Sequence, residues 1–145
     1  RVFIAAEQGQ ETAGESMTMQ ELKSIRIHRK RIRELDEKIE TLESEMEKIT
    51  PSMSEAPCKP TGGDKRAGQI ARLADLETER EERYALLVET LDKLSIWLIV
   101  LPEQQERVMY ARYMQGMSWR MVAKVTGYRK THCEKIHDRA IKKIC

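Results

Sequence analysis

Apolar residues repeat every seven positions in two separate runs within the first hundred residues. In the first run, the two seam positions are occupied by Ile25, Ile32, Ile39 and Met46, and by His28, Leu35, Leu42 and Ile49. The second run consists of Ile70, Leu73, Tyr84, Leu87, Leu91, Leu94, Leu98 and Leu101. It is interrupted by Glu77 and Arg80. Sustained heptads with charges between them are typical of coiled-coil helices, so the pattern predicts helices over about 18–50 and 65–100.

The segment between the two runs is dense in residues that break helices. It contains Pro51, Pro57, Pro60, Gly62 and Gly63. We therefore expect a loop over 51–64 and an antiparallel helical hairpin over 17–100. The first 16 residues are polar after Ala6 and precede Met17, so we expect 1–16 to be a non-native or flexible extension.

Charges along the hairpin are segregated by sign. Residues 22–33 hold six bases and no acid, whereas residues 34–47 hold seven acids and one base. An antiparallel return would bring the acidic half beside Lys65, Arg66, Arg72 and Arg80, and each such surface contact is worth only a few tenths of a kcal/mol.

The hairpin has one apolar stripe on each helix and needs further partners for a closed core. Residues 96–101 are apolar all round, and we expect them to be buried where the hairpin meets the C-terminal helices. A second copy of the chain is another candidate, so the sequence also predicts a homodimer through the hairpin.

The pattern changes after residue 101, where two short helices flank a turn between Ser118 and Lys143. A helix-turn-helix needs a small residue where its helices cross and a residue tolerant of positive φ at the turn; Ala123 and Gly127 have that spacing. We define the helix-turn-helix frame as Trp119, Val122, Ala123, Gly127, Cys133 and Ile136. The residues between its inward positions must face outward, as on a helix that enters a DNA major groove.

Positive charge is concentrated in the same segment. Residues 118–145 hold eight Lys and Arg against Glu134 and Asp138, a net charge of +6. The whole chain is +2, so residues 1–117 sum to −4. A basic helical tail can simply be solvated, but this distribution together with the frame favours phosphate binding.

A helix opened by Pro102, with acids in its first turn, is expected to run to Gly116, and Ser118 can cap the next helix. The motifs of this region are Leu101-Pro102, Arg107-Val108, Arg112-Tyr113, Gly116-x-Ser118-Trp119, Val122-Ala123, Gly127-Tyr128 and Arg139-Ala140-x-x-Lys143-Ile144. This series resembles region 4 of the sigma-70 class, which reads the −35 promoter element. The whole chain is similar to small sigma-region-4-like regulators of phages and prophages of Gram-positive bacteria, of the late-transcription or autolysin-regulator type.

The resemblance implies a DNA-binding domain over 101–145 and roles for particular residues. The positions that match the family's base-reading face are Lys130, Thr131, Glu134 and Lys135. Lysine can donate to guanine, glutamate can accept from cytosine, and threonine can contact a thymine methyl. The expected phosphate contacts are Arg120, Arg129, His132 and Arg139. Arg129 stands where such proteins usually have a Ser or Thr cap.

The residues give little support to an enzyme, a cofactor or a metal site. Gly62-Gly63 is not a phosphate-binding loop, and the three cysteines are dispersed, as expected in a reducing cytosol. Cys133 and His137 lie four apart, but Cys133 is needed for packing and no second ligand pair exists. No apolar run is long enough to span a membrane. We expect no catalysis, no cofactor, no metal and a cytoplasmic protein in a bacterial host.

Two functional classes remain. The first is a sequence-specific transcriptional regulator that binds double-stranded DNA, with RNA polymerase as a candidate partner. The second is a DNA-packaging adaptor resembling a phage small terminase subunit. Such adaptors usually place the DNA-binding helices first, and the reversed order in this chain favours regulation. A pure coiled-coil scaffold would leave the basic C-terminal segment unexplained.

Overall fold

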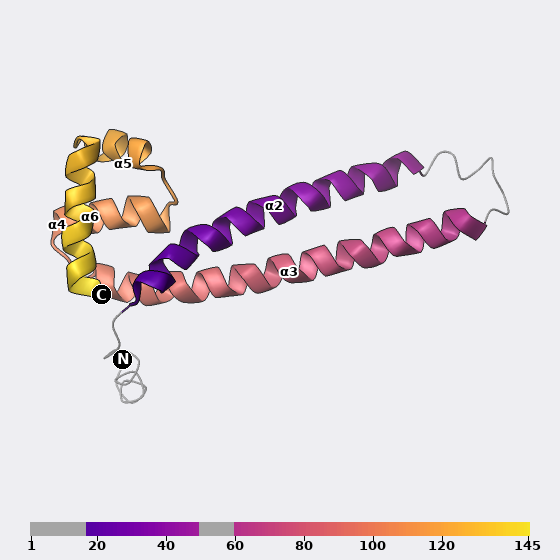
Figure 1. The fold of residues 1–145 in the computed structure, drawn as a ribbon, viewed down its shortest axis with the longest axis horizontal. Coiled ribbons are helices and arrows are strands. Elements are labelled where there is room, and N and C mark those ends of the chain that lie inside the picture. The colour runs from indigo at the N-terminus through magenta and orange to yellow at the C-terminus, as the bar shows by residue number, and fades with distance from the viewer. Residues whose placement is uncertain (1–16, 50–59) are drawn as a thin grey trace, which may run out of the picture. The chain divides into compact units, whose positions relative to one another are not determined.

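The computed structural model describes residues 17–49 and 60–145, and all regular elements in them are helices (Figure 1). They are α2 (Met19–Ile49), α3 (Pro60–Leu98), α4 (Glu103–Met109), η2 (Tyr110–Met114), α5 (Trp119–Thr126) and α6 (Lys130–Ile144). η2 is a π-helical segment that follows α4 directly. The predicted all-α fold, a long hairpin followed by a packed C-terminal helical group, is confirmed. The predicted extension 1–16 lies outside the described residues.

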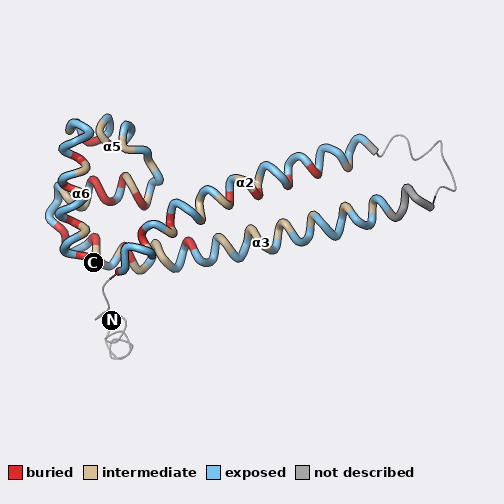
Figure 2. The backbone as a smooth tube through the Cα atoms, in the orientation of Figure 1, coloured by how far each residue is buried: buried red, intermediate tan, exposed pale blue. Residues whose placement is uncertain are grey.

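The chain divides into two compact units. Of the described residues, the hairpin unit contains 27–49 and 60–87, and the head unit contains 17–26 and 88–145. The hairpin unit buries the apolar stripe of α2 against α3, as the heptads predicted (Figure 2). The buried α2 residues of this unit are Ile32, Leu35, Ile39 and Leu42. Because this stripe is already buried within one chain, a second copy is not needed to cover it.

On α3 the seam differs from the predicted one. Ile70 is 53% exposed and Tyr84 is 46% exposed, so neither belongs to the interior. Arg80 and Arg83 are half-buried, and they precede the buried Leu87 at the alternating spacing of three and four that a seam requires. The stripe of α3 that faces α2 therefore includes arginines. Their aliphatic stems can cover apolar surface, while their guanidinium groups form hydrogen bonds.

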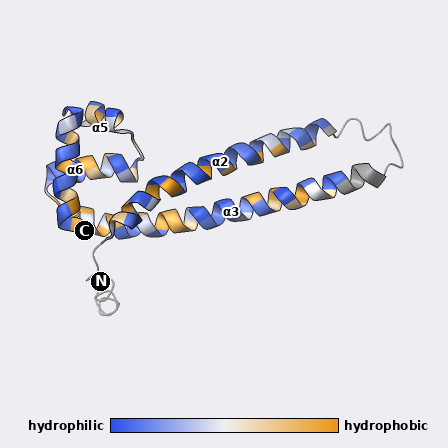
Figure 3. Cartoon of the chain, viewed as in Figure 1, coloured by the Kyte–Doolittle hydropathy of each residue, from blue (hydrophilic) through white to orange (hydrophobic). Residues whose placement is uncertain are grey.

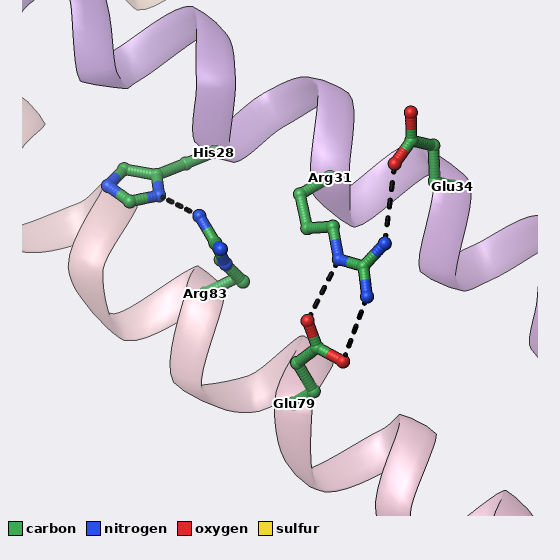
Figure 4. Close-up of polar contacts among 5 residues, drawn as sticks. All are labelled: His28, Arg31, Glu34, Glu79 and Arg83. Carbon is green, nitrogen blue, oxygen red and sulfur yellow. Dashed lines mark hydrogen bonds and ion pairs between the residues drawn. The ribbon is translucent and has the colours of Figure 1, made fainter.

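Polar side chains pair between α2 and α3 in both directions, with arginines of each helix donating to the other (Figure 4). Arg31 pairs with Glu79 through two hydrogen bonds, Nε to Oε2 at 2.8 Å and Nη2 to Oε1 at 3.1 Å. Hydrogen bonding to Arg31 lowers the pKa of the Glu79 carboxyl. Arg83 Nη1 donates to His28 Nδ1 at 3.1 Å, so this ring nitrogen carries no proton. Burial first, and then the Arg83 charge, lower the pKa of His28.

The expected pairing of the acidic half of the first helix with bases of the second is found at one close contact. Arg80 Nη1 lies 2.9 Å from Asp36 Oδ1. Arg66 donates instead to the backbone carbonyl of Met46 at 3.5 Å. These partially exposed contacts set which residues lie opposite one another and add little stability.

The expected loop over 51–64 is too long at its C-terminal end. α3 begins at Pro60, so residues 60–64 are helical and the prediction is wrong there. Proline lacks an N–H, which the first turn of a helix does not need, and its fixed φ suits that position. The first part of the expected loop lies outside the described residues.

The head unit has its own core, to which α2 contributes Leu22 and Ile25, both fully buried. From the C-terminal part of the chain come the buried residues Leu94, Leu98, Leu101, Val108, Met109, Ala111, Tyr113, Val122, Cys133, Ile136, Ala140 and Ile144. An ion pair between Lys93 Nζ and Glu21 Oε2, at 2.8 Å, joins α3 to α2 inside this unit. α6 packs against both α4 and α5.

Residues 96–101 are not buried as a block. Leu98 and Leu101 are buried, but Ile96, Ile99 and Val100 are strongly exposed, and the expectation that the whole run is covered is wrong. α3 ends at Leu98, and the N–H of Leu101 donates to the carbonyl of Leu98 at 3.2 Å. This tight turn points the two leucines inward and leaves their neighbours outside.

Candidate nucleic-acid interface

The two helices around the turn begin and end as the sequence predicted. Ser118 caps α5, because its Oγ accepts a hydrogen bond from the N–H of Met121 at 3.3 Å. α5 ends at Gly127, which has φ +83°, and the N–H of Gly127 donates to the carbonyl of Ala123 at 2.9 Å. Gly116, where the preceding helix was expected to stop, also has a positive φ of 72°. Pro102 was predicted to be the first residue of the next helix, but it is the N-cap of α4, which begins at Glu103.

The inward residues of the helix-turn-helix frame lie in one cluster. Val122, Cys133 and Ile136 are fully buried together with Val108 and Ala111. Trp119 and Ala123 are partly buried and pack against this cluster, as do Met117 and Tyr128. The frame therefore holds α5 and α6 against α4 through a continuous apolar contact.

Thr126, a buried polar residue at the end of α5, was not among the predicted site residues. Its Oγ1 donates to the carbonyl of Val122 at 2.7 Å and lies 3.5 Å from Cys133 Sγ. The same oxygen accepts from the N–H of Tyr128 at 3.4 Å. Thr126 thus links α5, the turn and α6 through its side chain. Its position directly before Gly127 is the feature of the sequence that could have indicated this role.

The N-terminus of α6 lacks a side-chain cap. Arg129 occupies the N-cap position in an extended conformation (φ −71°, ψ 154°), and its side chain makes no capping hydrogen bond. The backbone N–H groups of the first turn, at Lys130, Thr131 and His132, are therefore not capped by that side chain. Together with the helix dipole, such amides favour an anion.

The predicted base contacts lie along the outer side of α6. Lys130, Thr131 and Lys135 are exposed, whereas Glu134 is half-buried. The predicted phosphate contacts Arg120, Arg129, His132 and Arg139 are all exposed. Figure 2 shows the alternation of exposed and buried positions along α6. The structure thus places all eight side chains on α5, on α6 or in the turn between them.

The centre of the outer face of α6 includes residues that the sequence analysis had not selected. Buried positions at Cys133, Ile136 and Ala140 fix the inward side of the helix. By helical periodicity, the opposite side carries Thr131, Lys135, Asp138 and Lys142, all of which are exposed. Lys130 and Glu134 flank this row. In this row the acidic Asp138 separates Lys135 from Lys142.

A polar and aromatic group supports the inner side of α6. Tyr113 Oη and His137 Nε2 are 2.7 Å apart, and the edge of His137 meets the Trp119 ring at a centroid distance of 5.0 Å. The Arg112 guanidinium lies 4.4 Å from the centre of the Trp119 ring and donates to the carbonyl of Met117 at 3.0 Å. Burial lowers the pKa of His137, while its contact with Asp138 acts in the opposite direction. The four side chains link η2, α5 and α6.

Within residues 17–49 and 60–145, no group of three or more His, Cys, Asp or Glu side chains is arranged to hold a metal ion. No helix in the described part of the chain is long and apolar enough to cross a membrane.

Replacement of Gly127 tests the geometry of the turn. A Cβ at this position would meet no atom within 4 Å, so any cost comes from the backbone at φ +83°. Gly127→Val should lower the free energy of unfolding by about 1–3 kcal/mol, because a β-branched residue is strained at positive φ. Gly127→Asn is the matched control and should cost clearly less, since asparagine tolerates this region. Urea unfolding of the two variants measures the difference, and equal costs would contradict a conformational origin.

Neither a protein-family model nor a curated protein nor a solved structure matches the chain. Its function must therefore be argued from its own residues.

Proposed function

We propose that the head unit binds double-stranded DNA with α6 in the major groove, and that the protein is a sequence-specific transcriptional regulator. The observation that supports this most directly is that α6 exposes one face while its other face is buried in the apolar cluster with α4 and α5. Its first two turns present lysine, threonine and a half-buried glutamate. These side chains can distinguish base pairs by their edges in the major groove.

Phosphate binding is supported by three features of the same region. Residues 118–145 have a net charge of +6. Arg120, Arg129 and Arg139 are exposed around the outer face of α6. Their side chains are long enough to contact the phosphates of the DNA backbone. The start of α6 offers backbone amides without a side-chain cap, where a phosphate oxygen can accept hydrogen bonds.

The motifs that resemble sigma-70 region 4 extend the proposal from DNA binding to transcription. In this hypothesis the protein is a phage or prophage regulator that acts at a promoter in the bacterial cytoplasm. One small head makes few base contacts, so a second binding contact would raise affinity through effective concentration. RNA polymerase or a second copy of the chain could supply it.

Point variants of α6 test the proposal by separating base contacts from phosphate contacts. On a site obtained by binding-site selection, Lys130→Ala should weaken binding by about 1–3 kcal/mol and leave non-specific binding nearly unchanged. Glu134→Ala should also weaken the selected site, but it should improve non-specific binding because a negative charge is removed. Arg129→Ala should weaken all sequences alike. Fluorescence anisotropy with the selected and a scrambled duplex measures each effect.

Lys38→Ala is a matched control, since Lys38 is also an exposed lysine but belongs to the hairpin unit. It should leave both duplex affinities unchanged. If Lys130→Ala behaves like Lys38→Ala on the selected site, α6 does not read bases through this residue.

A further inference from the structure

The strongest feature outside α6 is an apolar groove in the head unit, between the end of α3 and the α4–η2 segment. It has a volume of about 370 Å³. Residues that line it include Ser95, Ile99, Leu101, Glu106, Tyr110 and Met114. We refer to it as the α3–α4 groove. None of these residues belongs to the proposed DNA contacts.

The segment that lines the groove at Ser95, Ile99 and Leu101 also exposes large apolar side chains to water. Ile99 is 82% exposed, Val100 69% and Ile96 61%, so three large aliphatic side chains are in water within five residues. Tyr110 adds a partly exposed ring from η2. Figure 3 shows hydrophobic residues toward the C-terminal end of α3. Large exposed apolar side chains gathered in one short segment are typical of an interaction site.

Most charges beside the patch are acidic, although the exposed base Arg107 follows Glu106 directly. Of the described residues that line the groove, only Glu106 is charged. Asp92 is exposed one helical turn before Ser95 and Ile96 and therefore shares their side of α3. Glu103 is exposed in the first turn of α4, and Lys93, the nearest base along α3, is paired with Glu21. The groove thus combines apolar contacts with an acidic edge, in contrast to the basic outer face of α6.

We propose that the α3–α4 groove binds an amphipathic helix of a partner protein, with Lys or Arg beside the apolar stripe of that helix. A helix laid in a groove anchors residues spaced three and four apart, and its flanking bases would meet Asp92, Glu103 and Glu106. A second copy of the chain fits less well. The exposed apolar segment of a second copy carries the same acidic neighbours, and these would meet the acidic edge of the groove as like charges.

The test uses the full chain and two labelled helical peptides of about 18 residues. Both carry the same leucine stripe; one has Lys at its flanking positions and the other has Glu. Binding is followed by fluorescence anisotropy. Ile99→Ser should weaken the Lys peptide about tenfold or more, because it removes a central apolar anchor from the groove. Ile70→Ser, which alters a comparably apolar but unrelated exposed position of the hairpin unit, should change the affinity less than about twofold.

Charge reversal provides the sharper readout. Asp92→Lys should weaken the Lys peptide and strengthen the Ile99-dependent binding of the Glu peptide, because the edge of the groove has changed sign. Any binding of the Glu peptide to basic α6 should be insensitive to Ile99→Ser and is distinguished in this way. Ile99→Ser and Asp92→Lys leave the residues proposed to contact DNA unchanged. The affinity of each variant for duplex DNA should therefore stay close to that of the unaltered chain, apart from a small effect of the charge added by Asp92→Lys.

Three results would overturn the proposal. The first is an absence of Ile99-dependent binding of the Lys peptide. The second is equal Ile99-dependent binding of both peptides, which would mean simple apolar adhesion. The third is a doubled mass of the free chain in light scattering that Ile99→Ser returns to 16.9 kDa, which would mean that a second copy covers the groove.

Discussion

Raising the salt concentration from 50 to 200 mM should weaken DNA binding by roughly 250- to 4,000-fold, a log–log slope of about −4 to −6. The reason is counterion release: each phosphate neutralised by a Lys or Arg frees cations that were condensed on the duplex. The head offers enough exposed bases for several such contacts, at positions 120, 124, 129, 130, 135, 139, 142 and 143. Anisotropy titrations at several salt concentrations give the slope directly.

The origin of that slope can be located with charge-removing variants. Arg129→Ala should reduce the slope by about one, as expected for one lost phosphate contact. Lys38→Ala, in the hairpin unit, should leave it unchanged. A slope near zero for the unaltered chain would contradict DNA binding by this basic face altogether.

Ile136→Ala should lower the free energy of unfolding of the head unit by about 2–5 kcal/mol. Ile136 is fully buried in the cluster that joins α4, α5 and α6, so its truncation removes apolar contacts and leaves a cavity. Both tryptophans, Trp97 and Trp119, belong to the head unit. Urea unfolding followed by tryptophan fluorescence therefore reports mainly on this unit.

Ile70→Ala is the control for this experiment. Ile70 is 53% exposed on the hairpin unit, and its truncation should change stability by less than about 0.5 kcal/mol. The folded fraction of Ile136→Ala should keep its DNA affinity at low temperature, because none of the side chains proposed to contact bases belongs to the buried cluster. A stability loss no greater than that of Ile70→Ala would mean that the cluster is not the core of the head.

The sequence was most informative where one residue type satisfies a local backbone requirement. Gly127 at φ +83° and the Ser118 cap of α5 follow from the chemistry of a helix end, so they could be predicted without the fold. The same holds for the inward positions Val122, Cys133 and Ile136, because helical spacing alone puts them on facing sides. Once the inward positions of α6 are known, the remaining positions of the helix must face outward. What binds to those outer positions remains a prediction.

The stripe of α2 was also predictable, since its heptads contain few apolar residues outside the seam. On α3, two different stripes of residues could face α2. The stripe with more apolar residues contains Ile70 and Tyr84, so the sequence favoured that one. The structure uses Arg80 and Arg83 instead, because Asp36 and His28 lie opposite them and accept their hydrogen bonds. Such pairing depends on the register of two helices more than forty residues apart in sequence, which no local pattern contains.

The sequence by itself thus determined the helical hairpin, the turn of the head and the sides of α5 and α6 that face inward. Each of these depends on spacing within a single helix or on the backbone preference of one residue. Only the tertiary structure decided that Thr126 joins α5, the turn and α6, and that Ile96, Ile99 and Val100 stay in water. An apolar run indicates that burial of its side chains is favourable. Which of these side chains are buried depends on the surface that packs against them.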